Sequence, residues 1–345
     1  MTQIISKKII TILFCCALAI VLVRCGGSDQ PSGTASSGAG GEKKTTKVFK
    51  LGHALDTTHP VHKAMVFMGE KLAEKSDGRL TLKITPNEQL GSEREMIEQV
   101  QLGLLDLTKS SMAPLEGFIP QAGVFSVPYI FRDREHFWKA LNSDVGHELL
   151  LAGESHGLRG LCYYDAGSRS FYTRDKPIRT PEDLVGLKIR VMQSQTSMKM
   201  VQSLGGSPTP IDWGELYTSL QQGVVDGAEN NPPSFGTSRH YEVCKYYSLD
   251  EHTMIPDVLM ISAKTWQSLS PEDQKIVQEA ADESSVYEIE LWTKMTAESL
   301  EKVKEAGVEV IHPDKAPFQQ KVQEMQKEYE GTPIGDLIKR IQAVE

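Results

Sequence analysis

One helical segment of unusual length constrains the fold of this chain more than any other feature of its 345 residues. Ser270, Pro271, Glu272 and Asp273 match the start of a helix, and neither glycine nor proline follows until Gly307. The 36 residues from 271 to 306 would extend about 54 Å at 1.5 Å per residue, whereas a domain of about 150 residues is roughly 30–35 Å across. We therefore expect one helix that runs along two lobes. Two helices joined by a kink are the alternative.

Short strand-like and helix-like segments alternate along the rest of the chain. We predict strands at 48–54, 80–84, 105–108, 158–164, 187–192, 224–228 and 258–261, with helices at 60–74, 93–104 and 215–221. Such alternation with short links is typical of an α/β fold with mostly parallel strands. The length of the chain also favours about two domains.

The N-terminus has the pattern of an export signal. Lys7 and Lys8 precede an apolar run at 9–23, which is shorter than the roughly 20 residues of a transmembrane helix. A basic start followed by an apolar core of this length is typical of a secretory signal. We expect residues 1–24 to be a signal peptide and the protein to be exported, to the periplasmic or cell-surface side.

Cys25 follows that signal directly. The segment 22–25 (LVRC) resembles a bacterial lipobox, although Arg24 stands where a small residue is usual. We expect Cys25 to carry a lipid anchor and the Gly- and Ser-rich residues 25–45 to form a flexible tether. Plain secretion and an uncleaved anchor are the alternatives.

Charge and cysteine content exclude several classes of protein. A formal net charge of −9 argues against a nucleic-acid partner, which needs a basic surface, but it allows an anionic small ligand. Beyond Cys25 only Cys162 and Cys244 remain. We expect both to be buried free thiols, although an oxidising compartment would permit a disulfide between them. The sequence contains no CxxC pair, which argues against a thiolate metal site.

Two motifs suggest chemistry that their context does not support. Residues 153–157 (GESHG) fit the G-x-S-x-G pattern of serine hydrolases. That motif needs a strand before the serine and a helix after it, whereas here the predicted order is reversed. His53, His59 and His62 lack further ligands at the spacing of a zinc site, so we expect them to form hydrogen bonds. We predict no enzymatic activity, no metal and no cofactor.

Three segments place polar residues where a predicted strand ends, at 165–172, 186–193 and 226–233. Ligands of open α/β sheets bind beyond the carboxyl ends of the strands. An arginine there, such as Arg169 or Arg190, can hold a carboxylate through two parallel charge-assisted hydrogen bonds. The alternative for each arginine is an ion pair with a nearby Asp or Glu.

Several of these segments together resemble the solute-binding proteins of TRAP transporters, in the dicarboxylate-binding (DctP) branch. The resemblance extends over about 47–330 and rests on the segments 89–91 (QLG), 100–103 (VQLG), 180–191 (TPEDLVGLKIRV), 205–210 (GGSPTP) and 215–230. It implies an α/β periplasmic binding protein fold, with two lobes joined by crossing strands and one long helix spanning both lobes. We place lobe I at 46–167 plus about 258–306, and lobe II at 168–257 plus about 307–345.

The resemblance also implies the residues of a binding site. Arg190 occupies the position of the family's carboxylate-binding arginine, Asn230 that of an amide that helps to hold the carboxylate, and Arg169 that of a second basic ligand in several members. The other candidates for ligand contact are Glu93, Gln193, Trp213, Asn231, His53 and His252. Ser111, with Lys109 nearby, stands where sialic-acid binders carry an acidic residue, which argues against sialic acid.

The implied function is capture of a carboxylate sugar, D-glucuronate or D-galacturonate, for uptake by TRAP permease subunits in the cytoplasmic membrane and driven by an ion gradient. A dicarboxylate or keto acid is the alternative ligand. A ligand sensor for a membrane receptor is the alternative role. We expect a monomer.

Overall fold

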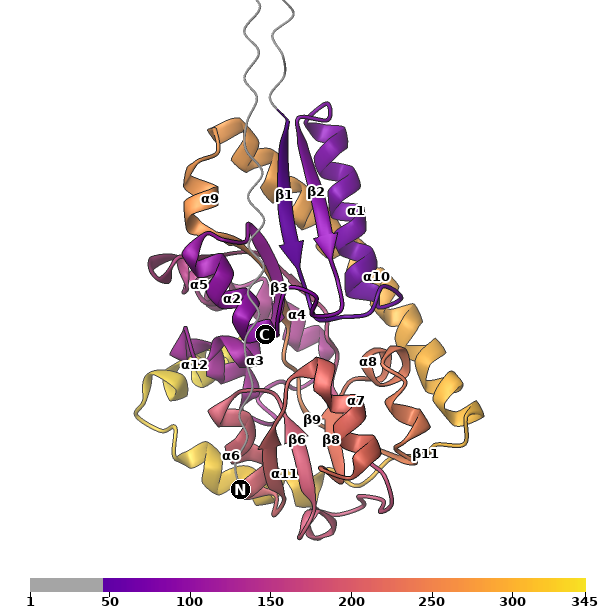
Figure 1. The fold of residues 1–345 in the computed structure, drawn as a ribbon. Coiled ribbons are helices and arrows are strands. Elements are labelled where there is room, and N and C mark those ends of the chain that lie inside the picture. Colours follow the sequence, from indigo (N-terminus) through magenta and orange to yellow (C-terminus); the bar gives the residue numbers. More distant parts are fainter. Residues whose placement is uncertain (1–45) are drawn as a thin grey trace, which may run out of the picture. The chain divides into compact units, whose positions relative to one another are not determined.

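The computed structural model describes residues 46–345 and is built on two β-sheets (Figure 1). The predictions for residues 1–45, including the signal peptide, Cys25 and the tether, lie outside the described residues. Within residues 46–345, no helix combines the length and apolar character that crossing a membrane requires.

The first sheet has the strand order β2-β1-β3-β10-β4. Its strands are β1 (Lys47–Gly52), β2 (Leu80–Thr85), β3 (Leu107–Ser111), β4 (Leu158–Tyr164) and β10 (Asp257–Ser262). β1 pairs in parallel with β2 and β3, whereas β10 is antiparallel to β3 and β4. The alternating apolar residues of β1 and β2 bury one face of the sheet against α1 (Pro60–Lys75). This burial explains why the apolar pattern predicts these three elements.

The second sheet has the order β11-β9-β5-β8-β6-β7. Its strands are β5 (Arg169–Thr173), β6 (Lys188–Val191), β7 (Ser207–Pro210), β8 (Gly227–Asn230), β9 (Tyr246–Thr253) and β11 (Glu309–Ile311). β6 is parallel to β7 and β8, and β5 is antiparallel to β8 and β9. Among residues 46–345, five strand pairs are parallel and four are antiparallel, so the expected majority of parallel pairs is present by a narrow margin.

The antiparallel pairs arise where the chain passes between the sheets. β4 of the first sheet leads into β5 of the second through residues 165–168, and β9 of the second leads into β10 of the first through residues 254–256. The third connection is α10 (Pro271–Glu305), one unbroken helix capped by Ser270. It contacts α1 beside the first sheet and α8 (Pro232–Thr237) beside the second (Figure 1). The expected α/β fold with a long helix spanning both halves is confirmed.

The remaining helices cover the sheets. They are α2 (Glu93–Leu102), α3 (Met112–Leu115), α4 (Arg134–Leu141), α5 (Asp144–Leu151), α6 (Gln195–Ser203), α7 (Trp213–Gln222), α9 (Ala263–Gln267), α11 (Ala316–Lys327) and α12 (Pro333–Gln342), with 3-10 turns η1 (Pro120–Ser126), η2 (Glu154–His156), η3 (Pro181–Leu184) and η4 (His240–Glu242). Cys162 and Cys244 are buried free thiols, as expected.

The C-terminal helix departs from the predicted division into lobes. Residues 307–345 were placed with lobe II, but α12 packs on α5 and η1, beside the first sheet. Its apolar residues recur at helical spacing, and Leu337 and Ile341 are buried in the same core as Phe137 of α4. In addition, the His136 imidazole forms a 3.0 Å hydrogen bond with the carbonyl of Ile341. The lobe boundaries near residues 167 and 257 stay a prediction.

Candidate functional site

A cavity lies at the carboxyl ends of β1, β3, β6 and β8, between the two sheets. The cavity is small, with a volume of about 40 Å³. The polar residues that line it come from both halves: Glu93, Lys109, Ser111 and Asp257 from the first, and Arg169, Arg190, Asn230, Asn231 and Ser234 from the second. The polar segments that follow the strands therefore do converge, as the position of ligands in open α/β sheets predicts.

Arg190 of β6 is a buried cation with no carboxylate partner among residues 46–345. Only 3% of its surface is exposed. Its Nε donates to the carbonyl of Ile211 at 2.8 Å, while its buried Nη1 has no hydrogen-bond partner. The guanidinium lies over the Trp213 ring, 5.7 Å from the centroid. Burial lowers the pKa of Arg190 below its usual value. Since an unpaired buried charge is costly, this position favours an anionic ligand.

Arg169, by contrast, is largely engaged within the protein. Its Nε and Nη2 donate to the two carboxylate oxygens of Glu229 at 2.5 and 2.8 Å, and Nη1 donates to Asn230 Oδ1 at 2.8 Å. Although burial alone would raise the pKa of Glu229, Arg169 and His252 lower it to about 2. For this arginine the structure contains the ion pair that was the alternative to ligand binding. A direct role of Arg169 in holding a ligand stays a prediction.

His252 belongs to the same buried network and does not line the cavity. Its Nδ1 is 2.9 Å from Asp250 Oδ2, and its Nε2 is 3.5 Å from Glu229 Oε2. Burial disfavours the charged ring, yet Asp250 and Glu229 raise the pKa of His252 to about 9. The charged imidazolium therefore stabilises the Glu229 carboxylate of the Arg169–Glu229 pair.

The wall contributed by the first half carries two carboxylates and one ammonium. Lys109 Nζ lies 3.0 Å from Asp257 Oδ2 and 3.3 Å from Glu93 Oε1. Lys109 is almost fully buried, but these two carboxylates raise its pKa despite the burial. This wall has a net charge of −1, because two anions oppose one cation. The opposite wall has a net charge of +1, because Glu229 neutralises Arg169 and Arg190 has no such partner.

The two asparagines are fixed through their oxygens. Asn230 Oδ1 accepts hydrogen bonds from Arg169 and from the backbone of Asn231, and Asn231 Oδ1 caps α8 by accepting from Ser234 N at 2.8 Å. The amide nitrogens are therefore the atoms that remain as donors. Both residues are buried and line the cavity.

Trp213 lines the cavity and, together with Gln193, a small cavity that adjoins it. Trp213 is the first residue of α7 and contacts Arg190. Gln193 lines a small adjoining cavity and donates from Nε2 to Asp212 Oδ1 at 2.6 Å. His53 is not on the cavity wall: it is fully buried, with Nε2 2.9 Å from His62 Nδ1. Burial, together with Lys109 and His62, lowers the pKa of His53 to about 2.

The candidate set from the sequence did not include Lys109, Asp257 or Ser234. Lys109 enters the sequence argument only as a neighbour of Ser111. A lysine inside the short strand β3 and an aspartate at the first position of β10 are the available signals, because an ionisable residue within a buried strand needs a partner. Which strand would supply that partner depends on the antiparallel β3–β10 pair, which links Ser111 with Asp257.

The motifs rejected from the sequence have ordinary structural roles. Ser155 lies in η2, after α5 and before β4, so the strand and helix of a hydrolase elbow occur in the wrong order. His59 caps α1 by accepting from Val61 N, and its Nε2 lies 3.2 Å from Ser234 Oγ. Among the described residues, no group of three or more His, Cys, Asp or Glu side chains could hold a metal ion.

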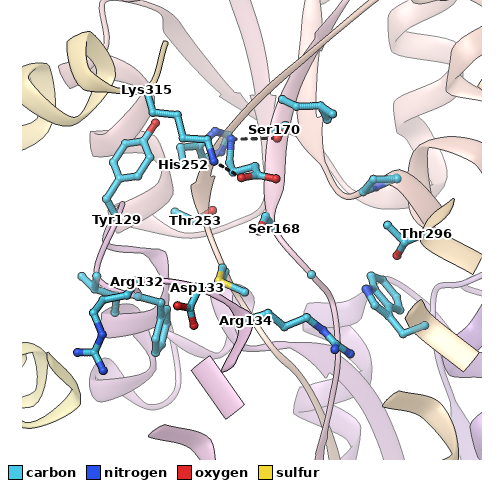
Figure 2. A pocket seen from close by; sticks show the side chains of 18 of the residues that line it. Tyr129, Arg132, Asp133, Arg134, Ser168, Ser170, His252, Thr253, Thr296 and Lys315 are labelled. Carbon is cyan, nitrogen blue, oxygen red and sulfur yellow. Dashed lines mark hydrogen bonds and ion pairs between the residues drawn. The ribbon is translucent and has the colours of Figure 1, made fainter. Parts of the chain in front are cut away.

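A second, larger cavity lies beside the crossing strands. Figure 2 shows the side chains that line it, among them Arg132, Arg134 and Lys315. The cations that line it already have partners. Arg134 pairs with Asp165, Lys315 pairs with Glu251, and Arg132 donates to backbone carbonyls of the C-terminal residues. Arg132 is exposed, so among the described residues this cavity lacks a buried cation without a carboxylate partner, the feature that distinguishes the Arg190 cavity.

Two lobes joined by crossing strands, with a buried unpaired arginine between them, define a solute-binding protein. Residues 51–332 match the family described as bacterial extracellular solute-binding protein, family 7 (DctP), so the chain belongs to that family, as its sequence motifs indicate.

Solved structures and curated relatives agree with this assignment. The chain is 43% identical to a TRAP periplasmic solute-binding protein from Xanthobacter autotrophicus Py2 with bound β-D-galacturonate (TM-score 0.83; 86% of this chain and 100% of that chain covered). It is 38% identical to one from Roseobacter denitrificans with bound β-D-glucuronate (TM-score 0.84; 87% and 100%). It is also 37% identical to a solute-binding protein of Chromohalobacter salexigens, over 77% of this chain and 80% of that protein.

Proposed function

We propose that this protein captures a uronate, such as D-glucuronate or D-galacturonate, and delivers it to the membrane subunits of a TRAP transporter. The observation that carries the proposal is Arg190, whose buried guanidinium has no carboxylate partner among residues 46–345. A ligand carboxylate would supply that partner. The uronates bound by the solved relatives support the same choice.

The opposite charges of the two walls favour a ligand with one carboxylate over a dicarboxylate. A carboxylate at Arg190 meets the wall with a net charge of +1. A second carboxylate at the far end of the ligand would face Glu93 and Asp257, with only Lys109 to offset them. Like charges placed together in a poorly solvated site cost several kcal/mol, so we expect this wall to exclude a second carboxylate.

The same wall suits the hydroxyl groups of a sugar. Glu93 and Asp257 offer acceptor oxygens, and the amides of Asn230 and Asn231 offer donors. A hydroxyl donates one hydrogen bond and accepts others, so it can connect an acceptor on one wall with a donor on the other. A pyranose acid presents several hydroxyls at the end away from its carboxylate, which matches this arrangement.

A thermal-shift screen tests the ligand class. At a ligand concentration 100 times the Kd, binding to the native state adds about 2.7 kcal/mol to its stability, so we expect D-glucuronate or D-galacturonate to raise Tm by several degrees. Succinate, malate, 2-oxoglutarate and sialic acid at equal concentration should leave Tm nearly unchanged. A clear rise with succinate and none with any uronate would contradict the proposal.

Asp257→Asn provides the matched variant for that screen. It removes one negative charge from the wall and keeps the size of the side chain. We expect it to bind uronates more weakly and to narrow the difference between uronates and dicarboxylates. If the preference of the variant equals that of the wild type, the wall charge does not set the ligand class.

The proposed protein binds its ligand without changing it. Incubation with uronates and with model esters should give no product, and turnover would contradict this part of the proposal. Neighbouring genes separate the two possible roles of the captured ligand: genes for permease subunits support transport, whereas a sensor kinase gene alone supports ligand sensing.

Attachment through Cys25 is part of the proposal and rests on the segment 22–25. Expression in a bacterium supplied with a radiolabelled fatty acid should label the wild type but not Cys25→Ala. Labelling of the Cys25→Ala protein, or no labelling of either protein, would contradict lipidation of Cys25.

A further inference from the structure

A hydrogen bond joins the two halves of the protein beside the cavity. Glu88 lies in the loop after β2, and its Oε2 accepts from the backbone N–H of Gly214 at 2.8 Å. Gly214 is the second residue of α7, where backbone N–H groups have no partner inside the helix. Glu88 thus caps a helix of the other half.

In each sheet, this contact lies at the edge opposite the crossing strands. The crossing strands β4 and β10 occupy one end of the first sheet, and β2 is the edge strand at the other end. In the second sheet, β7 is the edge strand opposite the side that carries β5 and β9, and α7 follows β7. Glu88 and Gly214 therefore meet at the edge where the halves separate most if the connecting segments bend.

Separation of the halves is required for binding, because Arg190 is 3% exposed and lies between the two walls. Building on the solute-binding function proposed above, we propose that Glu88 is a closing latch, whose carboxyl group joins the two halves when they close over the ligand. The hydrogen bond to Gly214 N must break each time the ligand enters or leaves.

The surroundings of Glu88 favour its neutral form in the closed protein. Its Oε1 is buried without a hydrogen-bond partner. The charged or titratable groups that face it are Glu93 and Arg94 of α2, Asp212 at the start of α7, Arg190 of β6 and His53, whose carbonyl accepts from Glu88 N. Burial above all, with Glu93 and Asp212 added, raises the pKa of Glu88 to about 7, against the opposing effects of Gly214 N–H and Arg190.

The direction of the pH dependence follows from this shift. When the halves are apart, Glu88 is solvated and its pKa returns toward the usual value of 4.5. Because the pKa is higher in the closed state, the contribution of Glu88 to closure is complete below pH 4.5 and is lost as the pH rises through about 7. Since Glu88 is only half-buried, we expect a modest effect: dissociation of D-glucuronate about tenfold faster at pH 8.5 than at pH 5.5.

Glu88→Gln separates the proton from the hydrogen bond. The amide oxygen still accepts from Gly214 N but cannot be charged. This variant should release D-glucuronate at the same rate at pH 5.5 and pH 8.5, and about tenfold more slowly than the wild type at pH 8.5. If Glu88 had only a structural role, Glu88→Gln would instead release D-glucuronate faster than the wild type at every pH. Glu88→Ala should release about tenfold faster than the wild type at pH 5.5.

Gly214→Ala tests the latch from the other half. A Cβ on Gly214 would lie 2.4 Å from Glu88 Oε2, and its other near neighbours also belong to Glu88. Alanine should stabilise α7 itself but displace the carboxylate, so release at pH 5.5 should be about tenfold faster while Tm does not fall. In the double variant Glu88→Ala/Gly214→Ala, release should match Glu88→Ala alone within about twofold, because the clash is gone.

Stopped-flow tryptophan fluorescence gives the dissociation rates, since Trp213 lies beside Arg190. Glu70→Gln serves as the control, because Glu70 is exposed on α1 and lines none of these cavities. An unchanged pH slope in Glu88→Gln, or additive effects in the double variant, would overturn the latch. If D-glucuronate produces no saturable signal in the wild type, the uronate proposal fails. The latch is then decided on the ligand-free protein at pH 5.5: faster hydrogen exchange of the Gly214 amide in Glu88→Ala supports it, and equal exchange contradicts it.

Discussion

Arg190→Ala is expected to weaken uronate binding at least about a hundredfold. A bidentate arginine–carboxylate pair makes two hydrogen bonds to charge, each worth about 1.5–3 kcal/mol, and each 1.4 kcal/mol changes Kd tenfold. The variant would also leave the ligand carboxylate buried without a partner, which adds to the loss. Lysine should restore little, because it keeps the charge without the planar fork. Calorimetry on the folded part of the chain measures the change.

The variant should not unfold the protein, and this separates a binding role from a structural one. Arg190 makes one hydrogen bond, from Nε to the Ile211 carbonyl, and forms no ion pair with the described residues. Removing it relieves the cost of a buried unpaired cation, so the Tm of the ligand-free protein should stay the same or rise. Binding within threefold of the wild type would show that the carboxylate is held elsewhere.

The halves of this fold differ in how far their sequence specifies them. In β1, β2 and α1 the apolar residues recur at strand and helix spacing, so both their type and their position could be predicted. β5 could not, because its residues begin with an arginine and lie almost entirely within the polar segment 165–172, which follows a predicted strand. That arginine is tolerated inside a buried strand because the antiparallel β5–β8 pair brings Glu229 beside it.

The site shows the same limit. That Arg190 lies near the carboxyl end of a strand is visible in the sequence, and the family resemblance assigns it a role. Whether an arginine is free or paired depends on neighbours that are distant in sequence: Glu229 is 60 residues from Arg169, and Asp257 is 148 residues from Lys109. No local pattern distinguishes Arg169 from Arg190, and only the pairing of strands does so.

The other large effect is expected at Arg169, on folding more than on ligand contact. The family resemblance implies that Arg169 is a second basic ligand, but its guanidinium is the partner of Glu229, and both side chains are at least 96% buried. Breaking a buried ion pair by removing one partner costs about 3–5 kcal/mol, because the remaining charge has no compensation. We expect a loss of that size in the free energy of unfolding, measured by urea denaturation at pH 7.

Lower pH and a double substitution test whether the lost stability of Arg169→Ala comes from the unpaired carboxylate of Glu229. Arg169 and His252 hold the pKa of Glu229 at about 2, below its usual 4.5, so the stability contributed by this group is present above pH 4.5 and is lost as the pH falls toward 2. Without Arg169 the carboxylate should protonate more easily, and the gap between Arg169→Ala and the wild type should narrow as the pH falls from 7 to 4. Arg169→Met/Glu229→Met, which removes both charges and keeps the volume, should recover most of the loss, since replacing a whole buried pair by apolar groups is often neutral. A double variant as unstable as Arg169→Ala, together with a gap that does not change with pH, would mean that Arg169 stabilises the fold through contacts other than its charge on Glu229.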